Sequence, residues 1–199
     1  MKISPVLSEL RKRLQKFKRY GYDLPASREH ILKRAGIRRG TVLEIGTGKG
    51  HLTSLLAKKN LYLVSIDMDP ASLQTAKKHL KALKRHSRVL LRLMNAEKLR
   101  FPSRSFDHVI SADFFHHAKR PLRCLKEMMR VTRGILTLAD LNRRGVKTMD
   151  FVHQSEGKRH ARSRIPFPDL KEYLLKNGFN VKSYRHTCHQ IFVAQRRNS

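Results

Sequence analysis

The sequence contains little cysteine, little acidic charge and no long apolar run. Cys124 and Cys188 are the only cysteines in 199 residues and lie far apart, so we expect two reduced thiols and neither a disulfide framework nor a zinc site. No segment approaches a membrane span, and residues 1–10 lack the apolar core of a secretion signal. No low-complexity stretch or repeat divides the chain. These absences predict one intracellular, cytoplasmic domain without a metal centre.

Acidic residues are scarce relative to basic residues. Only 15 Asp and Glu stand against 44 Lys and Arg, which gives a formal net charge of +29. A charge of this size attracts polyanions, but it does not determine the fold. Two interpretations stay open: an RNA, ribosomal or other anionic partner, or a solvated basic surface with no specific partner.

Two helices are predicted before the first strand, in an N-terminal cap over residues 1–40. Within residues 5–20, four apolar side chains fall on one helical face and basic side chains surround them, which predicts a basic amphipathic helix. A second helix is predicted from Ser27 to Ala35, with Ser27 as its N-cap and Gly36 at its end.

Strands and helices alternate from Thr41 to Asp140, the predicted core of the domain. Apolar strand runs of this kind suit a parallel sheet covered on both faces. A helix over 168–177 and two adjacent strands over 180–186 and 190–195 then predict a C-terminal antiparallel hairpin within residues 167–199. The predicted fold class is α/β, a Rossmann-like seven-stranded, mostly parallel sheet in a single domain.

Residues 141–166 show no clean periodicity and are rich in Lys and Arg. We interpret them as a basic loop that includes at most a helical turn. The segment follows the carboxyl end of a central strand, which is the edge where open α/β sheets bind ligands. It is therefore the candidate substrate lid.

A glycine-rich turn follows the first predicted strand. Gly46, Gly48 and Gly50 are spaced Gly-x-Gly-x-Gly, and His51 stands where a dinucleotide-binding loop would have its third glycine, which disfavours NAD. The next strand ends at Asp67, at the distance expected for a carboxylate that binds ribose hydroxyls. Nearby Asp69 is predicted to be an N-cap or turn residue instead.

These residues, together with Asn95-Ala96-Glu97, Phe101-Pro102, Ser105-Phe106-Asp107 and His116-His117, resemble class I S-adenosylmethionine-dependent methyltransferases. Within that class the chain is most similar to the branch that includes quinone-biosynthesis methyltransferases. The resemblance implies S-adenosyl-L-methionine as the cofactor, with the glycine loop beneath it, Glu44 supporting that loop and the methionine end, and Asp67 on the ribose. It also implies cofactor contacts for the following residues: Thr47, Met68, Asn95, Ala96, Ser111 and Ala112.

Two of these assignments carry a qualification. For Met68, which the resemblance places against the adenine, an ordinary core methionine is the alternative. Asn95 stands where the family usually has Asp, but its amide oxygen can still accept a hydrogen bond from the adenine amino group.

The candidate catalytic base is His116 or His117, because histidine titrates near neutral pH. A base is needed only if the acceptor must lose a proton before it attacks the methyl carbon. The interpretation we favour is that the pair only shapes the wall after the fourth strand. Other histidines match no compact metal-ligand spacing.

The acceptor is left open by the sequence. An unidentified small molecule, with an anionic one suiting the charge, is favoured over RNA or a ribosomal component, because motifs of particular nucleic-acid methylases are missing. An inactive methyltransferase fold that binds nucleic acid is the non-enzyme alternative. An NAD-dependent oxidoreductase is disfavoured by the glycine spacing.

Overall fold

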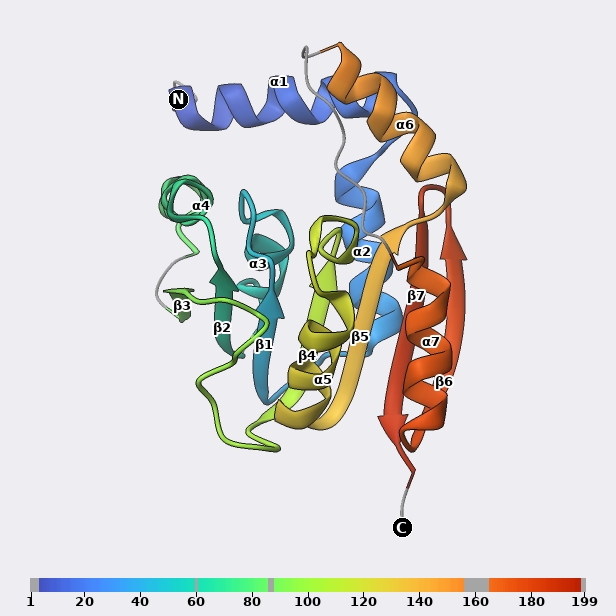
Figure 1. Cartoon of the computed structure of the whole chain (residues 1–199). Helices are drawn as coiled ribbons and strands as arrows, with labels where there is room; N and C mark the ends of the chain where they lie inside the picture. The colour runs from blue at the N-terminus through green and yellow to red at the C-terminus, as the bar shows by residue number, and fades with distance from the viewer. Residues whose placement is uncertain (1–3, 60, 86–87, 156–164, 198–199) are drawn as a thin grey trace.

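A computed structural model of the chain describes residues 4–59, 61–85, 88–155 and 165–197. Its centre is a seven-stranded sheet in the order β3-β2-β1-β4-β5-β7-β6 (Figure 1). The neighbouring strands from β3 to β5 pair in parallel, and β7 pairs antiparallel with both β5 and β6. The strands are β1 (Thr41–Ile45), β2 (Tyr62–Asp67), β3 (Val89–Leu93), β4 (Phe106–Ala112), β5 (Thr132–Leu141), β6 (Phe179–His186) and β7 (His189–Arg196). The predicted fold and its C-terminal hairpin are confirmed.

Helices cover both faces of this sheet. One apolar cluster joins the strands to α5 and α7, and a second joins them to α2 and α3. No helix in the described ranges is long and apolar enough to cross a membrane. The helices are α1 (Pro5–Arg19), α2 (Leu24–Ala35), α3 (His51–Leu56), α4 (Pro70–Ala82), the 3-10 turn η1 (Phe115–His117), α5 (Pro121–Val131), α6 (Arg143–Gln154) and α7 (Phe167–Lys176).

The second helix begins earlier than predicted. Asp23 is its N-cap and accepts a hydrogen bond from the Ala26 amide at 3.2 Å, whereas Ser27 is buried inside the helix. Pro25 lies in the first turn, where proline is tolerated because its missing N–H has no helical partner to lose. Gly36 ends the helix in the left-handed conformation, as predicted.

The predicted basic loop is wrong for residues 143–154, which form α6. Asn142 caps this helix through its side-chain oxygen, which accepts from the Gly145 amide at 2.9 Å. Apolar residues of α6 pack with Phe17 and Tyr22 near α1, so α1 and α6 lie together above the carboxyl ends of the strands (Figure 1). Residues 156–164 of the predicted lid fall outside the described residues.

Close backbone packing holds α6 on the β6–β7 turn. A Cβ at Gly145 would collide with the carbonyl oxygen of Cys188. Gly145→Ala is therefore expected to lower the free energy of unfolding by about 2 kcal/mol through overpacking, although alanine normally favours a helix by about 1 kcal/mol over glycine. Urea denaturation measures this change, and Lys147→Ala, at an exposed position of the same helix, is the control expected to stay within about 0.5 kcal/mol. Stabilisation by Gly145→Ala would contradict the packing.

Candidate functional site

A cavity of about 450 Å³ opens at the carboxyl ends of β1 to β4. The edge is the one expected for ligand binding, because loops after parallel strands converge there. Its lining includes seven of the residues singled out from the sequence: Gly46, Gly48, Asp67, Met68, Asn95, Ala96 and His117. The cavity has the size of a typical small-molecule site.

The glycine loop forms the floor of this cavity. Gly46 and Gly48 have φ angles of +83° and +51°. Residues other than glycine adopt this backbone conformation only at a cost in free energy. A Cβ at Gly46 would approach the Phe114 ring at 3.1 Å, and a Cβ at Gly48 would project into open space. Bare backbone at these two positions lets a ligand lie directly on the loop.

Asp67 ends β2 beside the glycine loop. Its carboxylate accepts hydrogen bonds from the Gly48 amide at 2.8 Å and from the Asp69 amide at 3.0 Å. A carboxylate can accept about four hydrogen bonds, so Asp67 keeps the capacity to bind a pair of hydroxyls. Asp69, by contrast, caps α4 through the Ala71 and Ser72 amides and does not line the cavity, which confirms its predicted N-cap role.

Glu44 lies behind the loop and outside the cavity lining. Its carboxylate accepts from the Ser65 hydroxyl at 2.7 Å, and the Ser65 and Thr47 hydroxyls lie 2.6 Å apart. The three side chains therefore connect β1, β2 and the loop. Burial of the Glu44 carboxyl raises its pKa to about 7.

The predicted adenine end is apolar and open. Met68 is 67% exposed, so the alternative of an ordinary core methionine is wrong. Ile66 and Met94 add apolar surface to the same cavity. The Asn95 side-chain oxygen accepts from the Glu97 amide at 2.8 Å, which fixes the turn that carries Asn95 and Ala96.

Besides Glu44, four predicted contact residues do not line the cavity. Thr47 points to Ser65, and Gly50 lies at the start of α3 against Ala76. Ser111 and Ala112 still belong to β4, where Ser111 pairs with its neighbours on both sides and is fully buried. The lining begins only after the strand ends, at Asp113 and Phe114.

The two candidate histidines face different surroundings. His117 lines the cavity, whereas the His116 ring contacts Asp140 at the end of β5, with 2.5 Å between Nδ1 and Oδ1. Burial alone would lower the pKa of His116, but the Asp140 carboxylate raises it. The rings of His116 and His117 lie 4.0 Å apart between centroids, so the contact of His116 with Asp140 also helps to hold His117 in place.

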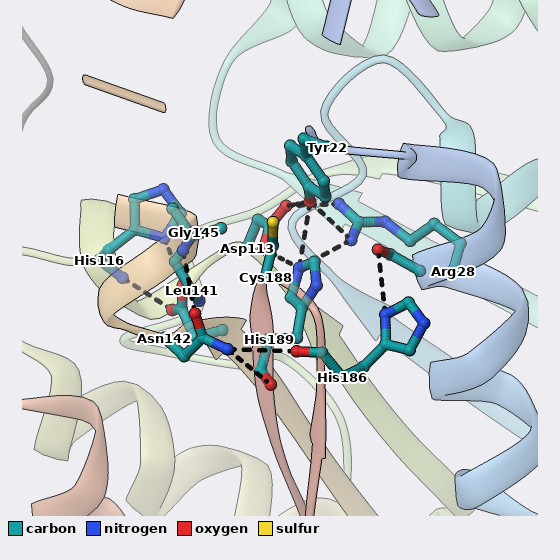
Figure 2. Close-up of polar contacts among 12 residues, drawn as sticks. Tyr22, Arg28, Asp113, His116, Leu141, Asn142, Gly145, His186, Cys188 and His189 are labelled. Atoms are coloured by element: carbon teal, nitrogen blue, oxygen red, sulfur yellow. Dashed lines mark hydrogen bonds and ion pairs between the residues drawn. The ribbon is translucent and has the colours of Figure 1, made fainter. Parts of the chain in front are cut away.

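A buried polar cluster at the same edge involves residues that were not predicted as functional. Tyr22, Arg28 and His189 converge on Asp113 (Figure 2). Arg28 Nη2 donates to the Asp113 carboxylate at 2.7 Å, and His189 Nε2 lies 2.8 Å from the other oxygen. Burial opposes ionisation of Asp113, but the Arg28 charge holds its pKa well below the usual range. The cluster attaches the N-terminal helices to the cavity wall.

The sequence held a signal for part of this cluster. Asp113 and Asp140 directly follow apolar strand runs, as Asp67 does, so each carboxylate reaches the ligand-binding edge. Of its partners, Tyr22 lies between α1 and α2, Arg28 lies in α2, and His189 begins the last strand. Their convergence depends on tertiary packing, which no local spacing encodes.

Comparison with known proteins identifies the family that this region resembles. Residues 43–135 match the family model described as "Methyltransferase domain". The ubiquinone biosynthesis O-methyltransferase of Parvibaculum lavamentivorans is 29% identical over 103 residues, 51% of this chain and 40% of that protein. An rRNA adenine N-6-methyltransferase of Clostridium perfringens is 32% identical over 87 residues, 43% of this chain and 34% of that protein. The matches thus span well under two thirds of these relatives.

A solved structure shows the same fold. A SAM-dependent methyltransferase from Aquifex aeolicus aligns with a TM-score of 0.64 at 22% identity, covering 85% of this chain and 89% of that chain. The family match confirms the resemblance found from the motifs, from which S-adenosylmethionine is the expected cofactor, and the solved structure shows the same fold.

The residues around the cavity fit that cofactor. Bare glycine backbone lies beside a carboxylate that can bind the ribose hydroxyls, and apolar side chains next to it suit a base. The cavity is also large enough for a nucleoside with a short amino-acid chain.

Proposed function

We propose that this chain, whose residues 43–135 match the methyltransferase-domain family, is an S-adenosylmethionine-dependent methyltransferase acting on a small anionic acceptor. The observation that carries the proposal is the cavity in which the glycine loop and Asp67 meet. Met68, Asn95 and Ala96, to which the resemblance assigns adenine contacts, line the same cavity.

The cofactor, when bound, supplies a methyl group on a sulfonium for in-line displacement. The chain's own contribution is positioning and exclusion of water. Asp67 binds hydroxyls at one end, the glycine loop admits the ligand to the backbone, and Phe114 closes the other side of the loop. His117, on the cavity wall, is placed to take a proton from an acceptor that must lose one.

Basic side chains support an anionic acceptor. Lys49 and Lys119 line the cavity, and α1 and α6 above it contribute further cations. The exposed basic residues of these helices include Arg11, Lys18, Arg19, Arg143, Arg144 and Lys147. A cluster of one sign raises the local concentration of an anionic substrate. The same residues support RNA or a ribosomal component as a second candidate acceptor, in line with the similarity to an rRNA methyltransferase.

Cofactor titration tests the proposal. We expect S-adenosylmethionine to bind the nucleic-acid-free protein in calorimetry and NADH not to bind. Asp67→Ala is expected to weaken that binding by about 10- to 100-fold, because hydrogen bonds to a charged group contribute about 1.5–3 kcal/mol.

The matched control for Asp67→Ala is Asp69→Ala, two residues along the chain. Loss of this exposed N-cap is expected to lower stability slightly and to change the cofactor affinity less than about twofold. Absence of binding to the wild-type protein would instead support the inactive, nucleic-acid-binding alternative. Equal loss in both variants would contradict a specific role for Asp67.

A further inference from the structure

A second hollow lies at the other end of the strands, away from the cofactor cavity, at the amino ends of β4 and β5. It measures about 860 Å³. Half of its lining consists of arginine, namely Arg104, Arg130, Arg133, Arg196 and Arg197. The other lining residues are Ser103, Gly134, Asn177, Gly178 and Gln195, so no carboxylate and no aromatic side chain lines it within the described ranges.

Two nearby carboxylates neutralise only part of this charge. Glu127 accepts from Arg130 Nε at 2.7 Å, and Asp107 accepts from Arg133 Nε at 3.0 Å. The other arginines of the hollow, Arg104, Arg196 and Arg197, have no ion pair with any described residue. The hollow thus carries an excess of positive charge that the described protein does not balance.

The backbone brings these cations together. β5 and β7 pair antiparallel from Ile135 opposite Gln195 onward, so the start of β5, with Arg133, lies beside the end of β7, and Arg133, Arg196 and Arg197 line the same hollow. Like charges gathered in one hollow repel each other, and a bound anion would offset that repulsion.

Arg196 is held in place beside them. Its Nη2 donates to the Met129 carbonyl at 3.0 Å, and its guanidinium lies 4.8 Å from the centre of the Phe179 ring. A guanidinium already fixed in this way loses little freedom when it binds a ligand.

We propose that this hollow binds the phosphate backbone of RNA. Guanidinium groups match the oxygens of phosphate in geometry and charge. The volume of the hollow, about 860 Å³, is far more than a single phosphate ion fills and leaves room for several linked phosphates. The described lining offers no aromatic surface for base stacking, so contacts would go to the backbone and be insensitive to sequence.

The hollow is separate from the cofactor cavity. The ten residues of β5 extend about 33 Å at the usual rise per residue, and the two sites lie at opposite ends of the sheet. RNA docking there does not depend on methyl transfer, and a binding assay without cofactor can test it.

The test compares two charge-matched double variants of the full chain. Arg104→Gln/Arg197→Gln removes two exposed cations of the hollow, and Lys77→Gln/Lys78→Gln removes two exposed cations of α4. Binding of a labelled oligouridine is followed by fluorescence anisotropy over a range of KCl concentrations. We expect the hollow variant to bind about tenfold more weakly, with a salt slope reduced by about 1.4, the value for two lost single-strand phosphate contacts. The α4 variant is expected to keep the wild-type slope.

Two outcomes would overturn the proposal. Equal weakening in both variants would mean that the net charge binds RNA without a site. Unchanged RNA binding in the hollow variant would mean that the hollow does not bind RNA. If the same variant also lost binding of tripolyphosphate, measured by calorimetry, the hollow would be a site for free polyphosphates. Thermal melting of both variants checks that each is folded.

Discussion

Replacing Arg28 with methionine is expected to lower the free energy of unfolding by about 3–5 kcal/mol. Arg28 and Asp113 form an ion pair with 2.7 Å between Nη2 and Oδ2, in which the Arg28 side chain is 7% and the Asp113 side chain 18% exposed. The substitution leaves the largely buried Asp113 carboxylate without its cation, although Tyr22 and His189 still contact it. An uncompensated buried charge costs more than the pair contributes when it is intact.

Urea denaturation of three further variants isolates this interaction. Lys33→Met removes the same charge from an exposed position of α2 and is expected to change stability by no more than about 0.5 kcal/mol. Asp113→Asn, alone and combined with Arg28→Met, completes a double-mutant cycle. The combined variant is expected to be more stable than the sum of the single losses predicts, because neither charge then remains buried alone. A loss below about 1 kcal/mol in Arg28→Met would contradict a buried pair.

The architecture could be predicted because its signals are local. Apolar strand runs, the glycine turn and the carboxylate at Asp67 each follow from a short stretch of sequence, and the structure has a strand, a loop and a strand end at those places. The helix α6 was missed because its apolar positions serve a small cluster with α1 instead of the sheet, and its basic residues obscure the period.

Partners from distant segments could not be predicted. Asp113 contacts Tyr22, Arg28 and His189 across sequence separations of 91, 85 and 76 residues. No spacing rule relates such positions, since only the packing of α2 and β7 against the end of β4 brings them together. The arginine hollow could not be predicted for the same reason. Its lining residues lie between positions 103 and 197, and the pairing of β5 with β7 and the end of α7 bring them together.

Glu44→Gln is expected to make the protein more stable at pH 8 and to have a much smaller effect at pH 4.5. The folded-state pKa of Glu44 is about 7, against an ordinary value of 4.5, because the carboxyl is buried. A group with a raised pKa contributes stability that is fully present below its unfolded-state pKa and is lost as the pH rises through the folded-state value. The shift corresponds to about 3 kcal/mol between pH 4.5 and 8. Glutamine is neutral throughout this range and avoids the loss.

Glu127→Gln provides a control of opposite sign. Hydrogen bonds from Arg130 hold the pKa of Glu127 below its ordinary value, so its contribution is present above the unfolded-state pKa and is lost as the pH falls. This substitution should therefore destabilise the protein more at pH 8 than in acid. Urea denaturation of both variants at the two pH values measures the differences from wild type, in which the other titrating groups cancel. A stability advantage of Glu44→Gln that did not grow with pH would contradict the raised pKa. The Glu44 carboxyl would then ionise at little cost in free energy, which would require water or a nearby cation to stabilise its charge behind the glycine loop.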